Sequence, residues 1–476
     1  MKKTQTKTAF AAGIGYTLGN ILIKGINILA LPIFSRILST EEFGVFNVFM
    51  SYDAILSVII GFALHSSIRS AKMQFKERIH EYTASVTILY FLNTLLLTVL
   101  VILFGRPISG LLGFKEPILY MLIIYSAGSA LIMLYNTWVS LDYSYGKYLL
   151  VAFINSIGTI GLSLFLISAV FSEQKDTGRI LGSTIVVGAL TIYLLIEIYR
   201  KAKPKYNREF WKYGLKYSLP IVPHGVSQIL LAQFDRITIR NVIGDAAAGI
   251  YSLAGNIKLI LTVITSSISA AWTTWFFEKM EEKAYKEIRQ RASQLAVFFS
   301  ILAIGLMALT PELIYLLGGK AYDQAKFVAI PMVLDALILF FYDLIVSGEY
   351  YTKNTVFIML GTILAAALNV VLNLIFIPRY GFVSAAYTTL AAYLCYLFLH
   401  IFISRKLVGF YIIPLKRMLL LGGFCGILAA VDLLLIESLL LRWGICAAVV
   451  IPMTLLLLKN AGYLKKRRNV NGEGNV

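Results

Sequence analysis

The chain contains about fourteen apolar stretches between Ala9 and Lys459, each long enough to cross a lipid bilayer. A helix needs roughly 20 residues to span about 30 Å of hydrocarbon, and its backbone must satisfy its own hydrogen bonds there. Only 14% of the residues are charged and 58% are hydrophobic, whereas soluble domains are about 25% charged. The sequence therefore predicts an all-α integral membrane protein made of transmembrane helices and short connectors.

The first apolar stretch follows only three lysines, Lys2, Lys3 and Lys7, and continues past Asn20 and Lys24. It lacks the small-residue cleavage site of a secretory signal peptide. We expect it to be retained as the first transmembrane helix.

The net charge of +18 is distributed unevenly between the two sides of the predicted membrane protein. If the N-terminus is cytoplasmic, the inner segments hold about three times as many Lys and Arg residues as the outer ones, as the positive-inside rule expects. The largest inner group lies between Arg200 and Lys212. Both termini are then cytoplasmic, and the basic tail Lys465 to Arg468 serves as a topology signal that can contact anionic lipid. No aromatic residues interleave with this tail, so we predict no nucleic-acid partner.

The sequence offers no pattern of catalytic or metal-binding residues. Cys395, Cys425 and Cys446 all fall inside predicted spans, which argues against a disulfide framework or a metal site. There is no phosphate-binding glycine loop, no HExxH motif and no Ser/His/Asp constellation. We therefore predict no enzyme activity, no catalytic residues, no cofactor and no metal.

The chain is internally duplicated. At a shift of 205 residues, the segment from Arg36 to Phe46 aligns with Asn241 to Tyr251, and Leu111 to Gly113 with Leu316 to Gly318. A nearly constant shift over about a hundred residues predicts two parallel six-helix repeats, as in many transporters. The expected organisation is an N-terminal lobe (1–199), a basic cytoplasmic linker (200–212), a C-terminal lobe (213–405), helices 13 and 14 (406–464) and a basic, disordered tail (465–476).

Several segments resemble the polysaccharide flippase family (Wzx type) of the superfamily that also holds MATE antiporters and lipid II flippases. They are Leu31 to Gly44, Asp235-Arg236, Ala248 to Ser252, Asn369 to Gly381 and Ser384 to Ala386. The resemblance implies a two-lobed carrier of an undecaprenyl-diphosphate-linked glycan in the bacterial cytoplasmic membrane. It also makes membrane lipids, a polysaccharide polymerase and chain-length machinery candidate partners.

Five ionisable side chains fall inside predicted spans, where each costs about 3 kcal/mol or more and is a functional candidate. These are Lys24, Asp53, Asp235, Arg236 and Lys258. Asn20 and Asn27 share a helical face with Lys24, and Thr262, Thr265 and Ser269 continue the face of Lys258. The predicted substrate-binding set is Asn20, Lys24, Asn27, Asp53, Asp235, Arg236, Lys258 and Thr262.

Two interpretations of these charges remain open. In the first, Lys24 with Asp53 and Asp235 with Lys258 form buried salt bridges within each lobe. In the second, they line a water-filled cleft where Lys24, Arg236 and Lys258 meet an anionic head group, Arg as a bidentate clamp and Lys as a point charge. Asp335, Asp343, Glu197 and Asp432 stand alone in the pattern and support no assignment. Asn369 and Asn373, one turn apart, are expected to join helices rather than to bind substrate.

Three other functions are compatible with these features. A drug or organic-cation antiporter would present unpaired acids, and Asp53 is the N-terminal candidate. A lipid II or teichoic-acid type flippase is the second, although related lipid II flippases present mainly cations where this chain has the acidic Asp53. The third is a non-transporting scaffold for glycan assembly, which the basic inner surface permits.

Overall fold

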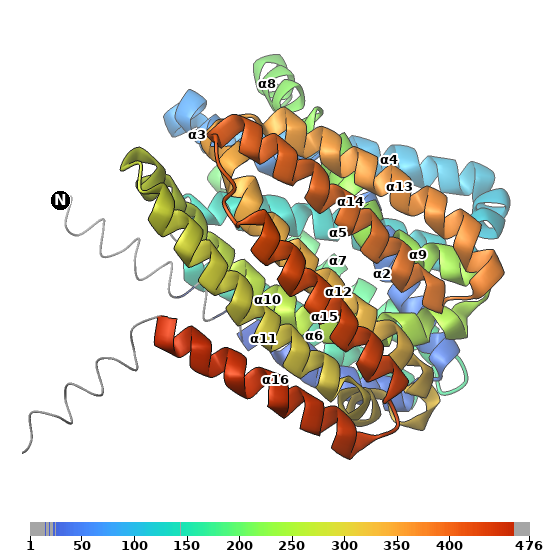
Figure 1. Ribbon diagram of the computed structural model, residues 1–476. Helices are drawn as coiled ribbons and strands as arrows, with labels where there is room; N and C mark the ends of the chain where they lie inside the picture. The colour runs from blue at the N-terminus through green and yellow to red at the C-terminus, as the bar shows by residue number, and fades with distance from the viewer. Residues whose placement is uncertain (1–14, 16–18, 20–21, 24, 143, 461–476) are drawn as a thin grey trace, which may run out of the picture. The chain divides into compact units, whose positions relative to one another are not determined.

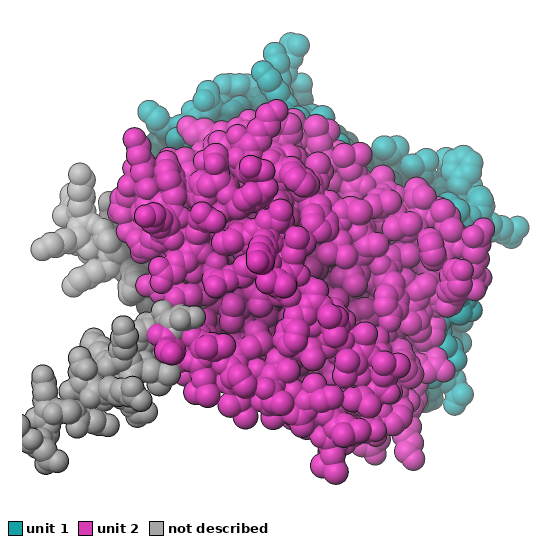
Figure 2. Space-filling view, in the orientation of Figure 1, with its two compact units in different colours: residues 1–249 teal, residues 250–476 magenta. Residues whose placement is uncertain are grey.

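The computed structural model describes residues 15, 19, 22, 23, 25–142 and 144–460 (Figure 1). The predicted site residues Asn20 and Lys24 and the basic tail 465–476 lie outside the described residues. Within the described part, the regular structure is helical throughout, which confirms the all-α prediction. Contacts divide the chain into unit 1, Met1–Gly249, and unit 2, Ile250–Val476, coloured separately in Figure 2.

Unit 1 holds the first half of the helices. Its described elements after residue 39 are α2 (Thr40–Ile60), α3 (Ile68–Phe75), α4 (Ile79–Leu112), α5 (Glu116–Ser140), α6 (Tyr145–Ala169), α7 (Lys175–Lys201), α8 (Arg208–Ser218), α9 (Ile221–Val242) and the start of α10 (Asp245–Glu281), with two short 3-10 turns.

Unit 2 holds the remainder of α10 and the helices that follow. These are α11 (Tyr285–Gly318), α12 (Lys326–Tyr351), α13 (Thr355–Tyr380), α14 (Val383–Val408), α15 (Leu415–Leu434) and α16 (Leu439–Asn460), with a 3-10 turn at Lys320–Ala325.

Twelve of the described helices are long and apolar enough to cross a membrane. A shorter apolar helix, Gly25–Ile37, precedes them, and α9 has 22 residues but carries Asp235, Arg236 and Arg240. The protein is thus a multi-pass membrane protein, close to the fourteen spans expected from the sequence.

Local sequence signals set several helix ends. Ser39 and Glu42 form a capping box at the start of α2, in which the Ser39 hydroxyl accepts from the Glu42 amide and the Glu42 carboxylate accepts from the Ser39 amide. α4 ends at Gly113, whose φ of 69° suits a residue without a side chain. Within α4, Phe104 leaves helical geometry three residues before Pro107, so the proline explains the kink.

The segment predicted as a linker leads into the amphipathic helix α8, which docks on unit 1. Asn207 caps α8 by accepting hydrogen bonds from the amides of Glu209 and Phe210. The Trp211 indole donates to the Ser85 carbonyl at 3.1 Å, and Phe210 is buried in a cluster with Tyr82. These contacts fix α8 to the first two turns of α4.

Candidate functional site

Asp53 of α2 is a buried candidate in unit 1. Its side chain is 7% exposed, and one carboxylate oxygen accepts a hydrogen bond of 3.3 Å from Ser129 of α5. The other oxygen has no hydrogen-bond partner among the described residues. Since Lys24 lies outside those residues, the predicted pair of Lys24 and Asp53 stays a prediction.

Asn27 lies on an exposed part of its helix rather than in the interior. Its carbonyl oxygen accepts a hydrogen bond of 2.7 Å from the buried Ser156 of α6. The side chain therefore joins its helix to α6, and this bond occupies part of its hydrogen-bonding capacity.

Asp235 and Arg236 lie together on α9, as their sequence positions require. Asp235 is 3% exposed, whereas Arg236 is half-buried and donates to Gln233 one turn earlier at 2.7 Å. The same Gln233 oxygen lies 3.3 Å from the hydroxyl of Ser51 on α2. Arg236 is thus oriented by a contact between α9 and α2.

The sequence pattern missed Arg240, which sits near the end of α9. Its Nε lies 2.7 Å from Asp245 at the start of α10, and its guanidinium donates to the carbonyls of Leu112 and Gly113. The group also stacks over the Phe114 ring at 4.1 Å. One buried arginine therefore ties α4, α9 and α10 together, and only the fold reveals this role.

In unit 2, Lys258 of α10 pairs with Asp335 of α12 at 3.5 Å, a partner that the sequence did not predict. Asp335 is 1% exposed and Lys258 is 19% exposed, with its ammonium 5.0 Å from the centre of the Tyr393 ring. Asp335, which had no assignment from sequence, is the counter-ion. The helical spacing showed that Lys258 is inside the membrane, but it carried no information on which helix faces it.

The other polar residues on the Lys258 face of α10, among them Thr262 and Ser269, also bond within unit 2. Thr262 donates to the Lys258 carbonyl one turn back at 3.0 Å, a common use of Thr in membrane helices. Ser269 donates to Asp343 of α12 at 3.1 Å, and the Trp272 indole donates to the Leu344 carbonyl. Lys258 and Ser269 thus both contact α12. The side chain of Lys258 is 19% exposed, so its ammonium group is partly accessible.

Two of the other unassigned acids also have roles in the structure. Glu197 of α7 forms an ion pair of 2.8 Å with Lys147 of α6. Asp343 accepts from Ser269, as above.

Asn369 and Asn373 of α13 are fully buried and bond to α14. Asn369 donates to Thr389, and Asn373 accepts from Thr388, as expected of residues that join helices. That prediction is confirmed.

Two apolar grooves lie among the described residues of unit 2. One, of about 770 Å³, lies between α10, α11 and α16 and is lined by Ser267, Ile268, Ala271, Trp272, Trp275, Arg291, Gln294, Leu295, Phe298, Leu457 and Leu458. The polar groups Arg291 and Gln294 belong to the first three turns of α11. The other lining residues are mostly apolar, so the groove is apolar along most of its length and has the cationic Arg291 among its lining residues.

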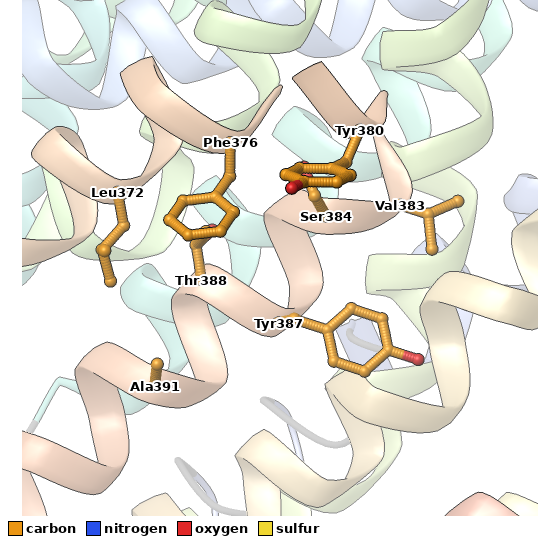
Figure 3. Close-up of a pocket in the computed structure, with 8 residues that line it drawn as sticks. All are labelled: Leu372, Phe376, Tyr380, Val383, Ser384, Tyr387, Thr388 and Ala391. Carbon is orange, nitrogen blue, oxygen red and sulfur yellow. The ribbon is translucent and has the colours of Figure 1, made fainter. Parts of the chain in front are cut away.

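The second groove, of about 490 Å³, lies between the end of α13 and the start of α14. Figure 3 shows Phe376 and Tyr380 projecting from α13, and Tyr387 projecting from α14 with its hydroxyl turned away from both. The Phe376 and Tyr380 rings stack at 5.8 Å, and all three side chains are at least 40% exposed. Exposed aromatic side chains near a helix end are typical of the membrane interface.

Among the described residues, no group of three or more His, Cys, Asp and Glu side chains is arranged to hold a metal ion. Several buried ionisable residues form ion pairs within one unit instead, such as Lys258 with Asp335. The described helices define a multi-pass helical membrane protein.

Comparison with known proteins identifies the family. The family model described as "Polysaccharide biosynthesis protein" matches residues 10–280, more than half of the chain. The chain belongs to this family.

The relatives agree with this assignment. A Haloferax volcanii protein named "Probable low-salt glycan biosynthesis flippase Agl15" is 21% identical over 393 residues, 80% of each chain. "Lsg locus putative protein 1" of Haemophilus influenzae is 23% identical over 363 residues, 72% of this chain and 86% of the relative.

Solved structures share the fold. The lipid II flippase MurJ in an inward closed conformation aligns with a TM-score of 0.71 and 17% identity, over 94% of this chain and 99% of MurJ. An inward-facing multidrug resistance MATE transporter of the MOP superfamily aligns with a TM-score of 0.61 and 15% identity, over 81% and 94%. Together the likenesses indicate a transporter rather than an enzyme.

Proposed function

We propose that the protein is a flippase that moves a polyprenyl-diphosphate-linked oligosaccharide from the inner to the outer leaflet of a bacterial cytoplasmic membrane. Membership of the polysaccharide biosynthesis family carries this proposal. The relative named as a glycan biosynthesis flippase supports it. We further propose that both termini are cytoplasmic, because this places most of the Lys and Arg residues inside.

The chemistry of the cargo explains why charged side chains lie inside the membrane. Each sugar hydroxyl stripped of water without a partner costs several kcal/mol, so the glycan needs a polar passage. The diphosphate needs cations. Lys258 and Arg236 are partly exposed cations on membrane helices, and Lys24 is the third candidate from sequence.

The polyprenyl chain needs an apolar surface that accompanies this passage. We propose that it occupies the groove between α10, α11 and α16. About 770 Å³ lined by Trp272, Trp275 and leucines suits an isoprenoid segment, and small-molecule sites span roughly 300–1,000 Å³. Arg291 at its end would lie near the diphosphate when the lipid first enters from the inner leaflet.

A charge swap tests whether Lys258 serves the cargo or only its own helix bundle. Lys258→Glu places two acids together and should abolish transport of lipid-linked oligosaccharide. The double variant Lys258→Glu/Asp335→Lys restores an ion pair between α10 and α12 but moves the cation. We expect the double variant to recover the amount of folded protein and not the transport, measured in proteoliposomes with oligosaccharide lipid extracted from the source membrane.

The control is Lys286→Glu, which reverses an exposed lysine at the start of α11 and should transport normally. Full transport by the swapped variant would show that Lys258 acts only as a structural cation. Failure of the unmodified protein to move any lipid-linked oligosaccharide would reject the proposed function.

The antiporter alternative has one specific observation in its favour, the Asp53 oxygen without a hydrogen-bond partner among the described residues. An acid of this kind is expected at an organic-cation site. Asp53→Asn should abolish efflux of ethidium if the protein is such an antiporter. If it is a flippase, ethidium efflux is absent in the unmodified protein as well.

A further inference from the structure

A fully buried carboxyl and imidazole meet between α12 and α14. The Nδ1 of His400 lies 2.6 Å from the Oε1 of Glu349, and both side chains are 0% exposed. The remaining atoms, Glu349 Oε2 and His400 Nε2, have no hydrogen-bond partner among the described residues. Neither residue belongs to the candidate cargo site.

The side chains around this pair include titratable tyrosines. Among the described residues, no observed contact joins a lysine or an arginine to Glu349 or His400. Tyr342 of α12 and Tyr396 of α14 place their rings 5.1 and 4.6 Å from the His400 ring, and their hydroxyls join at 2.7 Å. Asp343 and Tyr350 are the other titratable groups on this part of α12. α13 contributes Gly361, against which the His400 ring lies, and the hydroxyl of Thr362, which bonds to Tyr396.

The pair has three possible proton contents. With neutral imidazole and ionised carboxylate, its net charge is −1. One added proton makes it neutral, either as carboxylic acid beside imidazole or as carboxylate beside imidazolium. A second added proton makes it cationic. A net charge buried without a compensating partner is strongly disfavoured, so the packed structure favours the one-proton, neutral form.

The position of the pair gives the proton a short route to one side of the membrane. Glu349 lies in the last turn of α12, which ends at Tyr351, and Tyr350 beside it is 46% exposed. Local opening of this final turn would bring water to the carboxyl. By the charge distribution of the chain, this is the cytoplasmic end.

A contrasting pair in the same unit shows what a purely structural bridge looks like. Arg442 of α16 binds Glu312 of α11 through two nitrogens and also donates to the Ala308 carbonyl. Arginine keeps its proton in proteins, so that pair holds a fixed charge. A carboxyl beside an imidazole, by contrast, is a pair in which both partners can carry or release a proton.

We propose that Glu349 and His400 form a binding site for one exchangeable proton, and that its occupancy is linked to the transport cycle. With the proton bound, α12 and α14 pack tightly around a neutral pair. After its release to the cytoplasmic side, the remaining carboxylate favours a hydrated, less tightly packed arrangement of the two helices. A ligand of one conformation shifts the equilibrium towards it, so a pH difference would bias transport. The link between proton occupancy and the transport cycle rests on the proposed flippase function.

The first experiment measures the site without any cargo. Glu349→Gln preserves the shape, and its amide can donate to His400 Nδ1, but the titratable carboxyl is removed. In a potentiometric titration of purified protein, this variant should take up one proton fewer than the unmodified protein between weakly alkaline and weakly acidic buffer. The matched control Glu312→Gln also removes a buried-pair carboxyl but should show the unmodified count in that range.

The second experiment measures coupling. In proteoliposomes with extracted lipid-linked oligosaccharide, a pH gradient should change the transport rate of the unmodified protein and of Glu312→Gln severalfold. The rate of Glu349→Gln should be unaffected by the gradient. If Glu349→Gln does not fold, Glu349→Met, which also removes the titratable carboxyl, carries the same two measurements with the same expected results.

Equal proton uptake by the unmodified protein and Glu349→Gln would overturn the proton site. A difference of one proton combined with transport that ignores the gradient would overturn the coupling and leave the flippase function standing. No transport by the unmodified protein under any gradient would instead overturn the flippase function, and the proton count would still decide the site.

Discussion

The charged residues of this protein differ widely in the exposed fraction of their side chains. Arg442 is 2% exposed and binds Glu312, which is 32% exposed, at 2.6 Å. Arg106 is 96% exposed and lies 4.0 Å from Glu116. Both pairs join arginine to glutamate, but the pair of Arg442 is more buried, closer and hydrogen-bonded through two nitrogens.

Arg442→Ala should lower the free energy of unfolding by about 2–3 kcal/mol. Breaking a fully buried pair costs about 3–5 kcal/mol, and the partial exposure of Glu312 reduces that figure. Arg106→Ala should change stability by less than about 1 kcal/mol, because exposed pairs contribute little. Thermal unfolding in detergent measures both, and equal losses would show that burial does not set the strength of these pairs.

The residue scale is also where prediction from sequence reached its limit. Lys258 was recognised because a charge inside an apolar stretch is conspicuous. Its partner Asp335 was not, since the two residues are 77 positions apart and their meeting depends on how α10 packs on α12. Glu349 and His400 were missed for the same reason. A single sequence shows neighbours along one helix but not neighbours across two.

At the scale of helices, a polar ladder joins α13 to α14, which run side by side in Figure 1. Asn369 donates to Thr389 at 2.9 Å, Asn373 donates to Asn369 at 3.1 Å, and Thr388 donates to Asn373. This ladder was predicted in part, because two asparagines one turn apart on an apolar helix need partners on a neighbouring helix. Hydrogen bonds of this kind contribute about 0.6 kcal/mol each in membrane proteins, with a maximum near 1.7.

A double-mutant cycle measures the first rung of this ladder. Asn369→Ala and Thr389→Val should show a coupling energy of about 0.6–1.7 kcal/mol in detergent unfolding. Asn369→Ala and Thr362→Val form the control cycle. Thr362 lies on the same helix but bonds to Tyr396, so its effect should add to that of Asn369 without coupling. Coupling in both cycles would mean that the helices repack as a whole.

At the scale of the whole chain, the internal duplication appears in the order of the helices. α2 begins at Thr40 and α10 at Asp245, 205 residues later, and α4 and α11 each have 34 residues. The division at Gly249 differs from a break in the basic linker, because α8 and α9 pack with unit 1. The order of the helices could be predicted from the apolar stretches of the sequence. The division of the helices between the two units could not, because it depends on side-chain contacts that the spacing of apolar stretches does not specify.

Two equivalent glycines of the duplication, Gly44 and Gly249, touch each other within unit 1. A Cβ on Gly249 would overlap the Thr40 carbonyl oxygen and lie 3.1 Å from the Gly44 nitrogen. If the proposed flippase works by alternating access, contacts between the repeats open and close, and this close crossing of α2 and α10 is expected in one state of the cycle. Overpacking costs about 1–3 kcal/mol, and a bias of that size shifts a two-state equilibrium roughly 5–150-fold.

Gly249→Ala should therefore favour the state in which α2 and the start of α10 are apart. Ser51 of α2 is 0% exposed and lies 3.3 Å from Gln233 of α9, the helix that leads directly into α10, so it reports on the separation of α2 from the segment formed by α9 and the start of α10. With Cys395, Cys425 and Cys446 replaced, a cysteine at position 51 should react severalfold faster with a water-soluble maleimide when Gly249→Ala is present. Gly161→Ala, where an added methyl group meets nothing within 4 Å, should leave the rate unchanged. If Gly249→Ala also leaves it unchanged while the protein stays folded, the glycine crossing does not open during the cycle, and the moving contact lies elsewhere in the chain.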